Sequence, residues 1–101
     1  MINKFIIAMV QFFYVISVGV VQEFPSTQKK GEMTRKQTLV LKEAAGKNAD
    51  SFVANCWGEN IISLQAGDLV AASLRFSAVE RNGVYYQDIN IRGIELWRKK
   101  S

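Results

Sequence analysis

The sequence predicts an all-β protein: one small barrel of five strands, with one short helix between the third and fourth strands. The main observation is the pair Asn82-Gly83, which lies between two long runs of alternating apolar and polar residues. Both residues accept the positive φ of a type I′ turn, so residues 68–97 are predicted to form a hairpin. A hairpin alone is marginally stable, and three more strand-like runs precede it.

Composition limits the possible functions. The chain has 101 residues, 49% of them hydrophobic, which suits one domain with a real core. It has no His and only one cysteine, Cys56, so we predict no metal, no cofactor and no intrachain disulfide. Cys56 is expected to be a small core residue, and the lack of disulfides favours a reducing compartment, the cytoplasm. The formal net charge of +4 favours an anionic partner.

The first 21 residues allow two interpretations. Residues 5–21 are almost all apolar, which is typical of a secretory signal or of a short membrane-spanning segment. However, residues 15–21 are rich in Val and Ile, which favours a strand, and Gly19 would let that strand coil sharply. We predict a first strand over residues 12–24, preceded by an apolar extension over residues 1–11. The signal remains the alternative.

Turn residues bound the other strands. Pro25 ends the first strand, because proline cannot donate to a sheet ladder. Alternation then predicts strands over residues 34–42, 51–57, 69–80 and 84–97, followed by a basic tail over residues 98–101. Ile61, Ile62 and Leu64 predict one helical turn that plugs an open end of the barrel. Five strands with a helix between the third and fourth is the order of the OB-fold.

The inner faces of the strands follow from the period of two. On the third strand, Cys56 faces inward and Trp57 outward. We predict the core-facing residues of the last two strands to be Val70, Leu74, Phe76, Ile89 and Ile91. Gly93 marks a bulge in the last strand, and Trp97 is expected to pack and close the barrel.

Three segments resemble the bacterial single-stranded-DNA-binding proteins. They are Phe52–Gly58 (FVANCWG), Leu64–Val70 (LQAGDLV) and Glu80–Tyr86 (ERNGVYY), and they occur there in the same order. Over residues 12–97 the chain is most similar to a family of short OB-fold proteins related to them. The resemblance implies binding of single-stranded DNA on the outer face of the sheet, with Trp57 at a stacking position. The chain departs from the pattern at two positions where relatives often carry an aromatic and a basic residue, namely Ser51 and Val53.

A protein that binds single strands needs flat aromatic faces for the bases and cations for the backbone. Trp57, Tyr86 and Tyr85 are the stacking candidates, and one of the adjacent tyrosines is expected to pack inside. The alternative for Trp57 is that it covers the short helix. The candidate cations are Arg75, Arg92, Lys36 and Lys42 at outward strand positions, Lys29, Lys30 and Arg35 on the first loop, and Arg81 at the hairpin tip.

The sequence therefore predicts a binding protein and not an enzyme. Its carboxylates are scattered over turns and strands, and no nucleophile–base set is present. We predict binding of single-stranded DNA or RNA with little sequence preference and with strong salt dependence. One alternative is a protein-assembly module that forms homo-oligomers through residues 1–14. Another is a secreted or membrane-tethered OB domain with residues 1–21 as its signal.

Overall fold

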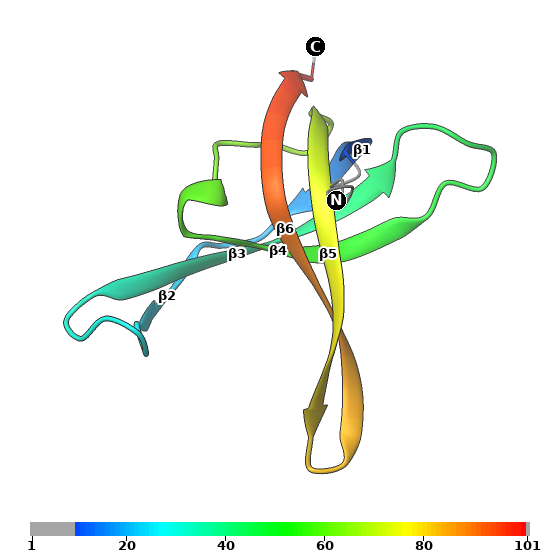
Figure 1. Ribbon diagram of the computed structural model, residues 1–101. Helices are drawn as coiled ribbons and strands as arrows, with labels where there is room; N and C mark the ends of the chain where they lie inside the picture. The colour runs from blue at the N-terminus through cyan, green and yellow to red at the C-terminus, as the bar shows by residue number, and fades with distance from the viewer. Residues whose placement is uncertain (1–9, 101) are drawn as a thin grey trace, which may run out of the picture.

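The computed structural model describes residues 10–100, which form one sheet of six strands (Figure 1). The elements are β1 (Val10–Val18), β2 (Gln22–Pro25), β3 (Met33–Glu43), β4 (Ser51–Trp57), the 3-10 turn η2 (Gly58–Asn60), β5 (Leu69–Arg81) and β6 (Val84–Arg98). The strand predicted over residues 51–57 is confirmed at both ends, and the others differ from their predicted bounds by a few residues.

The sheet closes on itself. Its order is β1-β5-β6-β4-β3-β2, and β1 also pairs with β3. The β4–β6 pairing is parallel and the others are antiparallel. This is the five-stranded OB-fold barrel, with β2 as the sixth strand along the outer part of β3. The predicted fold class is confirmed.

The predicted first strand is divided into β1 and β2 because the chain leaves the ladder at Gly19. The Gly19 N–H donates to the Thr38 carbonyl at 2.9 Å, and a Cβ on Gly19 would lie 2.8 Å from that oxygen. Only glycine permits so close an approach of two backbones. The sequence predicts that Gly19 coils one continuous strand, but Gly19 lies between β1 and β2, where it permits this close approach.

The structure also bears on the two interpretations of the N-terminal region. Residues 10–18, which the alternative interpretation assigns to a signal, form β1 of the barrel. Residues 1–9, most of the predicted apolar extension, lie outside the described residues. Within residues 10–100 no helix has the length and apolar character needed to cross a membrane.

The connection between β4 and β5 contains the predicted single helical turn, but the turn comes before Ile61 and not at Ile61, Ile62 and Leu64. Only the three residues of η2 are helical, and Ile61 and Leu64 lie in irregular chain beyond it. Both side chains still pack against the core. The Asn60 side chain holds this segment by donating to the carbonyl oxygens of Ile91 (3.2 Å) and Arg92 (3.3 Å). These two bonds anchor the connection to β6.

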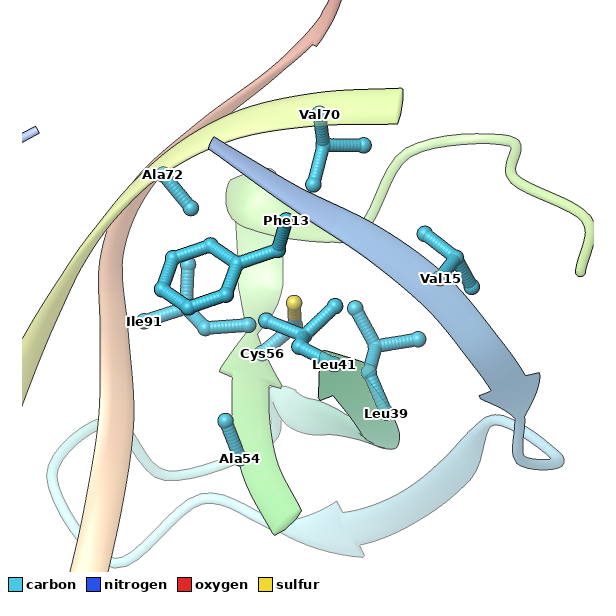
Figure 2. Close-up of a cluster of buried hydrophobic side chains, with 9 residues drawn as sticks. All are labelled: Phe13, Val15, Leu39, Leu41, Ala54, Cys56, Val70, Ala72 and Ile91. Atoms are coloured by element: carbon cyan, nitrogen blue, oxygen red, sulfur yellow. The ribbon is translucent and has the colours of Figure 1, made fainter. Parts of the chain in front are cut away.

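The core consists of inward-facing side chains from every strand of the closed barrel (Figure 2). Its buried members are Phe13, Val15, Leu39, Leu41, Ala54, Cys56, Val70, Ala72 and Ile91. Burial raises the pKa of the Cys56 thiol to about 11. The thiol therefore stays protonated and packs as a small apolar group, as predicted.

Two aromatic residues that the sequence places in the core lie outside it. Phe76 is 51% exposed because the β5–β6 hairpin continues past the barrel. Its ring packs edge-on against Phe52 at the border of the core, with 5.8 Å between the ring centroids. Trp97 is 61% exposed and packs edge-on against Phe12 at 5.2 Å. A register shift in the β5–β6 ladder leaves Trp97 without a partner. Its ring faces outward because, beyond Gly93, the side chains of β6 that pack against the core are Ile94 and Leu96, and alternation then turns Trp97 away.

The β5–β6 hairpin forms a long arm that projects from the barrel (Figure 1). At its tip Asn82 and Gly83 have φ of 53° and 82°, as the predicted type I′ turn requires. A second register shift leaves Arg92 unpaired just before Gly93, which confirms the predicted bulge. This bulge lies where the hairpin passes from the barrel into the arm, and bulges increase the twist of a strand.

Asp68 ties the C-terminal end of the chain to the turn before β5. Its buried carboxylate accepts from the backbone N–H groups of Lys100 and Gln65, both at 2.9 Å. These two hydrogen bonds hold the pKa of the carboxyl below its usual value. Asp68 thus stabilises the fold in its charged form.

We predict that Asp68→Asn lowers the free energy of unfolding by about 1–3 kcal/mol at neutral pH, because an amide has only one acceptor oxygen. Since folding lowers the pKa, the stabilisation is present above the unfolded-state pKa of about 3.9 and is lost as pH falls through the folded-state pKa. Urea unfolding at several pH values should show wild type losing more stability than the variant below about pH 4. Asp50→Asn, at an exposed carboxylate, is the matched control. An equal loss in both variants would contradict this account.

Candidate functional site

A groove of about 590 Å³ lies between the barrel and the β5–β6 arm. The barrel contributes β3 and β4, and the arm contributes both of its strands and the turn between them. The residues that line the groove are Lys36, Asn55 and Trp57 on the barrel, and Val79, Arg81, Asn82, Val84, Tyr86, Gln87 and Asp88 on the arm. It therefore combines aromatic, cationic and amide side chains with one carboxylate, Asp88.

The register of the strands explains why these residues meet. The β3–β4 ladder sets Lys36 opposite Trp57, and the β5–β6 ladder sets Val79 opposite Tyr86. Residues opposite one another in an antiparallel pair share a face of the sheet. A parallel bridge at Asn55 joins β4 to β6, so that the outer face of β4 continues onto the arm.

The Trp57 ring is held from two sides. Its Nε1 donates a hydrogen bond to Asn90 Oδ1 at 2.8 Å, and Lys36 Nζ lies 5.4 Å from the ring centroid. The second distance is that of a cation–π contact. The side chain is nevertheless 39% exposed, so part of the ring remains open to the groove. A ring fixed in this way loses little conformational entropy when a ligand stacks on it.

Further hydrogen bonds order the polar side chains beside Trp57. Asn90 Nδ2 donates to Asp88 Oδ2 at 3.1 Å, so one amide holds both the indole and a carboxylate. On the barrel side, Thr38 Oγ1 donates to Asn55 Oδ1 at 2.9 Å. That bond occupies the Asn55 amide oxygen and leaves its NH₂ group as the free polar end.

Four of the predicted site residues line the groove: Trp57, Tyr86, Lys36 and Arg81. Two others extend the same surfaces without lining it. Arg75 pairs with Asn90 in the β5–β6 ladder, on the face of the arm that carries Tyr86, and Lys42 lies on the outer face of β3 at the end away from Lys36.

The remaining candidates lie outside the groove lining. Lys29 and Lys30 are exposed in the loop between β2 and β3, as predicted, and the Ser26 hydroxyl accepts from the Lys29 N–H at 3.1 Å. Arg35 is not on that loop: it lies in β3, opposite Glu23, because β3 begins at Met33. Arg92 is exposed at the β6 bulge.

The expectation that one of the adjacent tyrosines packs inside is wrong. Tyr85 and Tyr86 are both exposed, because this part of the hairpin has no barrel behind it. Alternation decides only which side of the arm each ring occupies, and Tyr86 occupies the groove side.

The sequence analysis did not identify the polar residues that organise the site. Asn55, Asp88 and Asn90 stand at outward strand positions. Asn55 is two residues before Trp57, and Asp88 is two residues before Asn90. Polar amides at outward positions beside an exposed tryptophan are the signal that could have found them. No cluster of three or more potential metal ligands occurs in the part of the chain from residue 10 to 100.

Comparison with known proteins places the fold in a class. No family model and no curated protein matches the sequence. Among solved structures the chain is similar to the second OB-fold domain of replication protein A from Methanococcus maripaludis, with a TM-score of 0.65 and 17% sequence identity. The match covers 94% of this chain and 88% of that one. The protein is therefore an OB-fold domain, whereas membership of the short bacterial family stays a prediction.

Proposed function

We propose that this protein binds single-stranded nucleic acid in the groove between the barrel and the arm. The observation that carries the proposal is that two exposed aromatic rings, Trp57 and Tyr86, share one groove with two cations, Lys36 and Arg81. Any base can stack on a flat ring, and cations bind the phosphates. The similar OB-fold domain belongs to a replication protein, which agrees with a nucleic-acid ligand.

The position of the groove supports the same proposal. OB-folds bind oligonucleotides on the face of their second and third barrel strands, between the first and the last connecting loops. Here those strands are β3 and β4, and the loops are residues 26–32 and the turn at Asn82-Gly83. The groove lies on that face and against that turn.

Cations beyond the groove extend the positively charged surface on which the ligand can bind. Lys42 continues the outer face of β3, and Arg75 continues the groove side of the arm. Lys29 and Lys30 stand on the flanking loop. Each phosphate contact releases counterions, so affinity is expected to fall as salt rises. Stacking and phosphate contacts carry little sequence information, and DNA and RNA both supply them.

We predict that Trp57→Ala weakens binding of a fluorescent oligo-dT by about 1–3 kcal/mol, or about 5- to 150-fold, because one base stack is lost. Trp97→Ala is the matched control, since that indole is also exposed but does not line the groove. Fluorescence anisotropy at several salt concentrations measures both affinities, and oligo-rU tests RNA. Wild type that binds neither oligonucleotide at micromolar protein and low salt would refute the proposal. Equal losses in the two variants would place the ligand elsewhere.

A second candidate function, assembly, is favoured by an apolar surface on β1. Val10, Phe12, Tyr14 and Ile16 alternate along the outer face of this strand and are exposed, and Trp97 packs against Phe12. Soluble monomers rarely expose so contiguous an apolar surface. We propose that a second copy of the chain covers it, which agrees with the interface predicted in residues 1–14.

Trp97→Glu should then abolish self-association, because it places a charge beside Phe12 in the apolar contact. Sedimentation of the full-length chain should show a dimer or larger species for wild type and a monomer for the variant. Tyr85→Glu, at an exposed aromatic residue on the arm, should leave the mass unchanged. A wild-type monomer at concentrations of about 100 μM would exclude a stable interface of this kind.

A further inference from the structure

A carboxylate stands in a groove that is otherwise suited to a polyanion. Asp88 lines the groove together with Lys36 and Arg81. It pairs with Ser77 in the β5–β6 ladder, on the same side of the arm as Tyr86. One of its oxygens, Oδ2, accepts from Asn90, and its Oδ1 has no hydrogen bond from any of residues 10–100. Asp88 thus presents an acceptor to whatever occupies the groove.

The charge of Asp88 restricts which part of a nucleic acid can lie against it. A phosphate would be repelled by a carboxylate at contact distance. A base edge that carries N–H groups would satisfy the free oxygen, because hydrogen bonds to an ionised acceptor are the strong ones. The region around Asp88 therefore suits a base, and the cations of the groove suit the backbone on either side of it.

Among the four bases guanine fits a carboxylate best. Its Watson–Crick edge carries two adjacent donors, N1–H and N2–H, which can meet both oxygens of a carboxylate side by side. Adenine and cytosine offer one exocyclic amino group, each next to a ring acceptor. Thymine and uracil place a carbonyl on both sides of their single N–H, and those carbonyls would face the negative charge. Single-stranded ligands expose these edges for direct reading.

Asn55 adds a donor to the same site. Its amide oxygen is occupied by the Thr38 hydroxyl, so its NH₂ group is the end left to bind a ligand. Guanine carries an acceptor, O6, directly beside N1–H. Because each carboxylate oxygen can accept two hydrogen bonds, Oδ2 remains an acceptor beside the Asn90 bond. The acceptor pair of Asp88 and a donor from Asn55 together match the donor–donor–acceptor edge of guanine and of no other standard base.

The stacking ring and the carboxylate are held together before any ligand binds. Asn90 accepts from the Trp57 indole at 2.8 Å and donates to Asp88 at 3.1 Å. A base that stacks on Trp57 therefore has its edge within reach of Asp88. Such preorganisation favours selectivity, because neither group must be ordered during binding.

We propose that the groove contains one nucleotide position that selects guanine, with Asp88 as the residue that reads the base and Asn55 as its supporting donor. The proposal rests on single-strand binding as the function, and it adds a preference that stacking and charge alone would not produce. The contacts outside this position remain independent of sequence.

The test compares labelled oligo-dT of about ten nucleotides with the same oligonucleotide carrying one central dG, dI, dA or dC. Wild type should bind the dG oligonucleotide about 5- to 50-fold more tightly than oligo-dT. Inosine lacks the 2-amino group and should fall between them. Asp88→Asn should abolish the preference for dG and strengthen binding of oligo-dT, because the repulsive charge is removed.

Glu80→Gln is the matched control. It removes the same charge from the same hairpin, but Glu80 pairs with Tyr85 on the other side of the arm and does not line the groove. This variant should keep the preference for dG. Asn90→Ala is a second test variant, since it frees both Trp57 and Asp88 and should reduce the preference without removing the carboxylate.

The outcomes separate this proposal from the proposed function. Oligonucleotide binding without a preference for dG, or a preference that survives Asp88→Asn, would overturn the role of Asp88 and leave single-strand binding in place. The absence of binding to every oligonucleotide would remove both. Thermal unfolding of each variant shows whether a variant that loses the preference for dG is still folded.

Discussion

The structure depends on the double pairing of β1, which joins β3 on one side and β5 on the other. This pairing closes the barrel and removes its free edges. It requires the chain to bend away after β1, which is possible because Gly19 has no side chain to clash with the Thr38 carbonyl. Closure also decides which strand positions face the core and which remain for function. A small set of apolar residues occupies the inward positions (Figure 2).

The β5–β6 hairpin is longer than the barrel needs, and the extra length creates the candidate site. Within the barrel the hairpin is a wall of the core, whereas beyond it both faces meet solvent (Figure 1). Aromatic residues on this outer part of the hairpin, such as Phe76 and Tyr85, are therefore exposed. One side of this arm stands across from β3 and β4, and the groove is the space between them.

The groove combines two chemical requirements that oppose each other. Lys36 and Arg81 attract a polyanion, whereas Asp88 repels it. The conflict is resolved if the phosphates and one base occupy different parts of the groove. Asn90 keeps the carboxylate and the Trp57 indole in fixed relation, so the base is stacked and read at one place. In this interpretation the cations supply affinity and the single acidic residue supplies selectivity.

Local sequence determined the features that depend on neighbouring residues. The turn at Asn82-Gly83, the strand over residues 51–57 and the inward position of Cys56 follow from backbone preference and from the period of two. Tertiary structure decided the features that depend on distant residues. Trp97 is exposed because a bulge shifts its register, and the helical turn η2 is anchored to β6 by the Asn60 side chain. The groove also belongs to this second group, since its walls come from strands whose distance is fixed only by closure of the barrel.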